Sequence, residues 1–523
     1  MTDDLSPRLR AVCDLNAAEA RELGGRHEYD GVIQDLSPDG VRAGLDALAR
    51  ATDTDDPLED AYDEAHLAAF EDHARVVFGE LELHRRNPLF HLFGLDLASY
   101  DRDYAPQADR HRARVSQLAR WPQAVDAAIA ALDRVSSPVA AALLAGIQGL
   151  PAGIPDDAPD EIAGPARAAH ERLVVAVTGM AAGGDPDPAL GGPALSMLMG
   201  SAERMEVDLG GLAERADAER DRLRELLAAS CARIDPGWPP LEVARELVRD
   251  HPGTDGVIDA ARHWTQRVID FTREHDLVPY HDGECLVGLA PPSRRWAMAM
   301  MSWAAPGEPE APSWYYITPP DKSWPEREAA EWLEVFSATT LPGITVHEVA
   351  PGHFSHGRAL RRAATPVRRV LFSDAFAEGW AHYAEEMCVE QGFGGDDPRF
   401  EIGVWLEALV RVTRLACAIG VHTAGMSVEE GARRFEADTH LSGPAALSEA
   451  RRATFDPTYG RYTWGKLAIL DLREQAIQTW GAGFSLPRFH SAMLALGSPP
   501  LGLLGTAIVR GLPMRAPSPA PSA

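Results

Sequence analysis

The amino-acid sequence predicts a mainly α-helical fold with a small β-sheet element. Up to about residue 280, apolar residues recur at spacings of three and four with charges between them, as in PPLEVARELVRD (239–250). This is the period of amphipathic helices. Clusters of glycine and proline, such as GLPAGIPDDAPDE (149–161), separate these segments and predict loops between helices.

Short apolar and aromatic runs cut by prolines replace this pattern between about residues 283 and 325. The best strand candidates are ECLVGLAPP (284–292), RRWAMAMMSWAAPG (294–307) and SWYYITPPDKSWP (313–325). Helical periodicity then continues to about residue 510. We therefore expect an N-terminal helical region (1–280), a region with the small sheet and the candidate site (281–510), and a disordered tail (511–523).

The composition is that of an acidic globular protein of 523 residues, with 45% hydrophobic and 24% charged residues. Lys and Arg number 50 and Asp and Glu number 78, so the formal charge is −28. Such a surface repels phosphate backbones and anionic lipids, so neither nucleic acid nor a membrane is an expected partner.

The cysteines and the N-terminus indicate a cytoplasmic protein. The five cysteines are scattered and never spaced as CxxC, which argues against a disulfide framework or a thiolate metal site. The N-terminal MTDDLSPRLRAVCDL carries acids where a secretion signal needs a basic start and an apolar core. The apolar runs are much shorter than the ~20 residues that a membrane helix needs.

His347, Glu348 and His353 form the candidate metal motif. In the usual zinc helix the second histidine follows the first by four residues, but here that position is Pro351. On a regular helix, His347 and His353 would point about 120° apart. Two alternatives remain. Either the helix ends at Pro351-Gly352 and the histidines are ordinary polar residues, or two residues bulge there and return His353 to the face of His347.

Glu378, 25 residues after His353, lies at a plausible return distance for the next antiparallel helix and is a candidate third ligand. Two histidines and one carboxylate leave a coordination position open, as in catalytic rather than structural zinc sites. We therefore expect one Zn²⁺ ion, although Mn or Co could be bound by the same ligands. Glu348 is placed to polarise the metal-bound water.

Several longer strings resemble those of a bacterial family called domain of unknown function 885, which is grouped with the gluzincin-type zinc metallopeptidases. The resemblance extends over roughly residues 50–510. The matching strings are HEVAPGH (347–353), FAEGWAHYAEE (376–386), RLACAIGVH (414–422), YTWGKLAILDLR (462–473) and FSLPRFHSAMLALGSPPL (484–501).

The resemblance implies a helical metallopeptidase fold in which His347, His353 and Glu378 bind zinc. It also implies that Glu348 is the general base and later the proton donor to the leaving amine. The chain departs from the family's usual strings at three positions outside these four residues: Phe354, His382 and Ala418 replace His, Leu and Asp.

The same resemblance suggests residues that bind the substrate. Tyr462 is the candidate donor to the developing oxyanion, since gluzincins often supply a tyrosine there. Arg414 and His422 could bind a substrate carbonyl or carboxylate. Tyr316 lies in a strand that resembles the one with which related peptidases hold the substrate backbone by edge pairing. Each of these residues could equally be structural.

Other side chains near the motif are candidates for supporting roles. Glu385 lies two helical turns after Glu378 and so on the same face, which suits a carboxylate that orients a ligand histidine. His382, one turn after Glu378, could hydrogen-bond the Glu378 carboxylate or merely pack. His356 is a competing ligand, and His490 is more often structural than catalytic at such a helical position.

The expected function is therefore a zinc-dependent peptidase that cleaves a peptide or small amide by water attack. Two alternatives remain: a helical binding protein of the same fold without turnover, and a zinc hydrolase of non-peptide amides or esters. The sequence does not distinguish exopeptidase from endopeptidase behaviour, nor does it indicate the oligomeric state.

Overall fold

Helices dominate the computed structural model, which describes residues 5–54, 56–291, 294–295, 297–321 and 323–511. They make up 67% of the chain and strands 4%, so the prediction of a mainly α-helical fold is confirmed. The tail predicted at 511–523 lies, from residue 512 on, outside the described residues.

The helices before the sheet are α1 (Pro7–Asp14), α2 (Ala17–Glu22), α3 (Pro38–Thr54), α4 (Ala61–Ala74), α5 (Leu83–Arg86), α6 (Leu89–Leu95), α7 (Gln107–Leu118), α8 (Trp121–Ala131), α9 (Ser137–Gly149), α10 (Asp160–Gly183), α11 (Gly192–Glu203), α12 (Leu209–Ala232), α13 (Pro240–Leu247) and α14 (Val257–Glu274). The helices after it are α15 (Glu326–Leu333), α16 (Leu341–Glu348), α17 (His353–Leu360), α18 (Pro366–Val370), α19 (Asp374–Glu390), α20 (Arg399–Thr423), α21 (Val428–Asp438), α22 (Gly443–Phe455), α23 (Arg461–Trp480), α24 (Leu486–Leu494) and α25 (Thr506–Arg510).

The sheet has three strands, β1 (Cys285–Leu289), β2 (Ala299–Ser302) and β3 (Ser313–Ile317), in the order β1-β3-β2. All three fall in the segment for which strands were predicted. β3 is the central strand: it runs parallel to β1 and antiparallel to β2. Tyr315 of β3 faces α16, and its hydroxyl lies 3.5 Å from the hydroxyl of Thr345.

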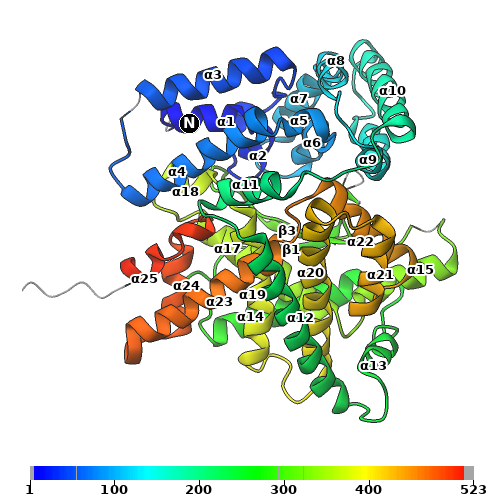
Figure 1. Cartoon of the computed structure of the whole chain (residues 1–523), viewed down its shortest axis with the longest axis vertical. Coiled ribbons are helices and arrows are strands. Elements are labelled where there is room, and N and C mark those ends of the chain that lie inside the picture. The colour runs from blue at the N-terminus through cyan, green and yellow to red at the C-terminus, as the bar shows by residue number, and fades with distance from the viewer. Residues whose placement is uncertain (1–4, 55, 292–293, 296, 322, 512–523) are drawn as a thin grey trace, which may run out of the picture.

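The largest hydrophobic core surrounds the sheet and α16, and it crosses the boundary predicted at residue 280. It joins fully buried residues of α12, β3, α19 and α20, such as Leu223, Tyr315, Trp380 and Leu409. Figure 1 shows α12 and α14 in the lower part of the molecule together with α19, α20 and α23, whereas α1–α10 form the upper part. The helices before the sheet therefore belong partly to the half of the molecule that contains the candidate site.

Two further findings concern the helices and the cysteines. Of the helices in the described part of the chain, none is both long and apolar enough to cross a bilayer. All five cysteines are free, as their spacing predicted.

Candidate metal centre

The chain is interrupted between the two predicted histidine ligands, where α16 ends and α17 begins. The amide of Gly352 donates to the carbonyl of Val346 at 3.2 Å, and the amide of Ser355 donates to that of Val349 at 3.3 Å. Each bond spans six residues, whereas an α-helical bond spans four. Two extra residues are thus accommodated at the break, and the predicted distortion is confirmed.

Gly352 and Trp380 make this break possible. A Cβ atom at Gly352 would lie 1.9 Å from the carbonyl oxygen of His347, so a side chain there would collide with the end of α16. The indole Nε1 of Trp380 donates to the carbonyl of Pro351 at 3.0 Å, and the carbonyl oxygen of Gly352 lies 3.3 Å from the same nitrogen. The tryptophan of the EGW string therefore satisfies the backbone carbonyl of Pro351, whereas that of Gly352 also accepts from the amide of His356 at 3.0 Å.

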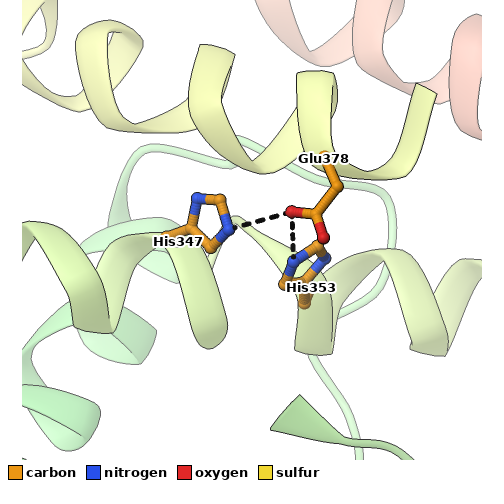
Figure 2. Close-up of side chains that lie close together, drawn as sticks. All are labelled: His347, His353 and Glu378. Atoms are coloured by element: carbon orange, nitrogen blue, oxygen red, sulfur yellow. Dashed lines mark ion pairs between the residues drawn. The ribbon is translucent and has the colours of Figure 1, made fainter. Parts of the chain in front are cut away.

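His347, His353 and Glu378 converge across the break, as Figure 2 shows. Glu378 Oε2 lies 3.3 Å from Nε2 of His347 and 3.3 Å from Nε2 of His353. One ligand atom from each residue lies within 4.8 Å of the other two. The second of the alternatives left open by the spacing, a bulge that returns His353 to the face of His347, is the one found.

These separations suit a tetrahedral metal ion. With metal–ligand bonds of about 2.0–2.1 Å, two ligand atoms of a tetrahedron lie about 3.3–3.4 Å apart. Glu378 Oε2 is buried and makes no hydrogen bond within the described part of the chain. A buried carboxylate oxygen between two imidazole nitrogens, with no hydrogen bond of its own, is an arrangement that a bound cation would satisfy.

Close packing of α19 against α23 brings Tyr462 to the same site. A Cβ at Gly465 would lie 1.8 Å from the carbonyl oxygen of Ala375, and one at Gly379 would lie 2.4 Å from the carbonyl carbon of Gly465. The glycines therefore let the two backbones touch beside the metal ligand of α19. Tyr462, at the start of α23, stacks at 6.3 Å on the ring of His347. Its hydroxyl makes no hydrogen bond with any described residue.

Glu385 lies behind His347, as its helical spacing from Glu378 predicted. The Nδ1 atom of His347 donates to Glu385 Oε1 at 2.6 Å, and the Glu385 side chain is only 1% exposed. Burial by itself lowers the pKa of His347, and nearby Arg411 lowers it further. The nearby carboxylates of Glu378 and Glu385 outweigh both effects and raise this pKa to about 9. In the metal-free protein His347 thus holds a proton that a metal ion would displace.

Arg411 is a buried residue of this site that the sequence analysis missed. Its Nη1 donates to Glu385 Oε2 at 2.9 Å. Burial raises the pKa of Glu385, but the positive charge of Arg411 and the contacts with His382 and His347 lower it well below its usual range. Arg411 lies in the apolar run LEALVRVTRLACAIGV (406–421), and a charged residue there needs a buried partner. This pattern could have identified it.

Of the two alternatives for His382, the bond to Glu378 is not found. His382 Nδ1 instead lies 3.4 Å from Glu385 Oε2. Helical periodicity allows either contact, because residues three and four apart on α19 share a face. Burial lowers the pKa of His382 to about 4, so its ring is neutral at pH 7.

Arg414 lies near the site, but its guanidinium is already paired. Nε and Nη2 each donate to the carboxylate of Glu449 at 2.7 Å, and the guanidinium lies 5.2 Å from the centre of the Tyr462 ring. The fork that would hold a substrate carboxylate is therefore occupied by the chain's own glutamate. In this arrangement Arg414 supports Tyr462 instead of presenting a free binding group.

Neither His422 nor Tyr316 has the free group that its expected contact with a substrate would need. The amide of Leu190 donates to Nδ1 of His422 at 3.2 Å, and Nε2 of His422 donates to the carbonyl of Ala453 at 2.8 Å, so both ring nitrogens are used. Tyr316 lies in the central strand, which is paired on both sides, so it has no free edge for a substrate. Its ring stacks on Trp314 on the sheet face opposite Tyr315.

The two remaining histidines have structural partners. His356 is buried and its Nε2 donates to the carbonyl of Gly497 at 3.1 Å. His490 donates from Nδ1 to the carbonyl of Leu277 at 2.6 Å, while its Nε2 accepts from the hydroxyl of Tyr383 at 3.0 Å. Neither belongs to the group of possible metal ligands.

Glu348, the proposed base, is the last residue of α16 and is partly exposed. Its carboxylate makes no hydrogen bond to the described residues. It lies near the strands, because its charge adds to the effect of burial in raising the pKa of Cys285 to about 12. Glu348 thus directly follows the candidate ligand His347, and its carboxylate has no hydrogen-bond partner among the described residues.

Comparisons with known proteins agree with the fold. The model of a family described as "Bacterial protein of unknown function (DUF885)" matches residues 18–508. The solved structure of a "putative lipoprotein of unknown function" from Shewanella oneidensis is similar at a TM-score of 0.76 and 19% identity, over 96% of this chain and 98% of that one. That of a "putative lipoprotein" from Colwellia psychrerythraea is similar at 0.77 and 16%, over 97% and 99%. No curated protein matches the chain.

Proposed function

We propose that this chain, which belongs to the bacterial protein family of unknown function DUF885, is a zinc-dependent hydrolase that cleaves peptide or amide bonds. One observation carries the proposal. Glu378 Oε2 lies 3.3 Å from Nε2 of both His347 and His353, about the edge length of a zinc coordination tetrahedron. The order of HEVAPGH and EGW along the chain, which resembles the gluzincin peptidases, supports it.

The residues of the site divide the chemistry between them. His347, His353 and Glu378 would hold the ion, which when bound lowers the pKa of a water ligand toward ~7 and polarises a carbonyl. Glu348 accepts the proton of the attacking water and returns it to the leaving nitrogen. The free hydroxyl of Tyr462 donates to the oxygen on which negative charge develops.

Metal content and one substitution test this proposal. The purified protein is expected to contain near-equimolar zinc, to hydrolyse members of a panel of short peptides with free and blocked ends, and to lose this activity with a chelator. Glu348→Gln should abolish hydrolysis while zinc stays bound. Glu331→Gln, at an exposed glutamate of α15 paired with Arg327, is the control and should keep full activity.

Each alternative has its own outcome. Absence of zinc, together with indifference to the chelator, would overturn the enzyme proposal in favour of a binding protein. Bound zinc with cleavage of esters or non-peptide amides, and of none of the peptides, would identify the other hydrolase class. A fully active Glu348→Gln variant would show that the assigned base is wrong. Preference for a free end would separate exopeptidase from endopeptidase action.

A further inference from the structure

Arg411 brings a buried positive charge to the rear of the candidate metal centre. It lies in the middle of α20, and only 7% of its side chain is exposed. Its Nη1 donates to Glu385 Oε2 at 2.9 Å, and Nη2 lies 3.8 Å from the carboxylate of Glu407 one turn earlier on the same helix. It therefore links α20 to the carboxylate that contacts His347.

The two oxygens of Glu385 have separate partners. Oε1 accepts from Nδ1 of His347 at 2.6 Å, whereas Oε2 accepts from Arg411 and lies 3.4 Å from Nδ1 of His382. The hydrogen bond from Arg411 to Oε2 restricts rotation of the Glu385 carboxylate. Oε1 therefore stays directed at the imidazole of His347. Short charge-assisted bonds of this kind define the position of both groups.

This contact also decides which nitrogen of His347 can bind a metal. An ionised carboxylate only accepts hydrogen bonds, so Nδ1 must carry a hydrogen, and Nε2 is the nitrogen whose proton a metal ion would displace. Nε2 is the atom that faces Glu378. Arg411 Nη2 lies 3.5 Å from Nδ1 and could donate only to an unprotonated nitrogen, but the contact of Nδ1 with Glu385 is much shorter, at 2.6 Å, and therefore determines the tautomer.

We infer that Arg411 is a positioning residue of the metal centre: it holds Glu385 so that His347 presents Nε2 to the ion. This inference rests on the proposed function, because it requires a metal ion at His347. Without Arg411, the buried carboxylate of Glu385 would lose its arginine partner. A buried carboxylate without a cationic partner turns away or becomes neutral. His347 would then lose its fixed orientation and ring tautomer.

A purely structural role for Arg411 predicts a different outcome, and the chain offers a matched control. Arg368 of α18 is equally buried, with 7% of its side chain exposed, and its Nε donates to Asp63 of α4 at 2.6 Å. The two residues thus share burial and carboxylate pairing, but Arg368 contacts none of the residues of the metal centre. Loss of Arg368 should affect folding stability without affecting the metal.

The experiment measures zinc affinity of the metal-free, full-length protein by competition with a chromophoric chelator. We expect Arg411→Met to bind zinc 10- to 100-fold more weakly, the usual effect of removing a group that orients a metal ligand. Arg411→Lys, which keeps the charge, should recover most of this loss. Arg368→Met should bind zinc within about threefold of the wild type. The visible absorption of bound Co²⁺ should change in Arg411→Met and not in Arg368→Met.

Coupling to Glu385 supplies a second test. Glu385→Gln should weaken zinc binding to a similar degree, and combining it with Arg411→Met should add little, because both act through the same contact. If Arg411→Met does not fold, Arg411→Gln removes the charge while keeping a polar side chain and gives the same comparison.

The outcomes separate this inference from the proposed function. Zinc affinity unchanged in Arg411→Met, or reduced as much in Arg368→Met, would overturn the positioning role alone. Wild-type protein that binds zinc and shows the Arg411 effect but cleaves no substrate would overturn the hydrolase proposal and leave the positioning role supported. Wild-type protein that binds no zinc would overturn both.

Discussion

Replacing Gly465 by alanine should destabilise the protein, because α19 and α23 touch at this position. The added Cβ would lie 1.8 Å from the carbonyl oxygen of Ala375 and 2.9 Å from Cα of Gly379. Ordinary carbon–oxygen contacts are about 3.3 Å or longer. Because the obstacle is backbone on the facing helix, no side-chain rotation can relieve it, and the helices must separate by about 1 Å or more.

The size of the effect follows from two opposing terms. Alanine gains about 1 kcal/mol over glycine in helix propensity. Overpacking typically costs about 1–3 kcal/mol and occasionally more, and a backbone collision lies at the upper end. Gly179 of α10 provides the reference, because a Cβ there would meet nothing within 4 Å. Since the propensity term is common to both variants, Gly465→Ala should be about 3 kcal/mol less stable than Gly179→Ala.

Guanidinium chloride unfolding followed by tryptophan fluorescence measures this difference. The midpoint of Gly179→Ala should rise above that of the wild type, and the midpoint of Gly465→Ala should fall below it. Zinc affinity should also fall in Gly465→Ala, because Glu378 precedes the glycine that faces Gly465. If Gly465→Ala were as stable as Gly179→Ala, the close helix contact would be refuted as the reason for glycine here.

Two further predictions concern buried groups around the site. Burial raises the pKa of Glu203, which accepts from Ser373, to about 7 from 4.5. Because the protonated form is favoured on folding, this stabilisation is fully present below pH 4.5 and is lost as pH rises through 7; it amounts to about 3 kcal/mol. Unfolding midpoints measured from pH 4.5 to 8 should therefore decline more in the wild type than in Glu203→Gln, and equal slopes would contradict the assignment. Trp380→Phe leaves the buried carbonyl of Pro351 without its donor, which should cost about 1–3 kcal/mol and weaken zinc binding. Unchanged unfolding and unchanged chelator competition would show that the break in the helix does not depend on the indole.

The candidate metal ligands His347 and His353 could be predicted from the sequence because their spacing lies within one short segment. Helical periodicity gives the angle between residues on one helix, so the spacing of His347 and His353 was enough to show that a regular helix fails at Pro351-Gly352. The same periodicity placed Glu385 on the face of Glu378. The helical fold and the position of the strands were predictable for the same reason, since both patterns repeat over a few residues.

The roles assigned to Arg414, His422 and Tyr316 could not be derived in this way. Each depends on which group of a distant segment lies opposite. The carboxylate of Glu449 accepts hydrogen bonds from the guanidinium of Arg414, and backbone groups form hydrogen bonds with both ring nitrogens of His422. The strand order could not be predicted either. The sequence indicates that Tyr316 lies in a strand, but not that this strand pairs with another on each side.

The sequence by itself therefore determined the helical class, the interruption of a regular helix at Pro351-Gly352 and, with Glu378 added from a later segment, the candidate ligands, but it left open whether His353 returns to the face of His347. Only the tertiary structure decided that Glu378 Oε2 lies 3.3 Å from both histidines and that Arg411 stands behind Glu385. Those contacts join α16, α17, α19 and α20, and such long-range partners are selected by packing of whole helices rather than by any local pattern.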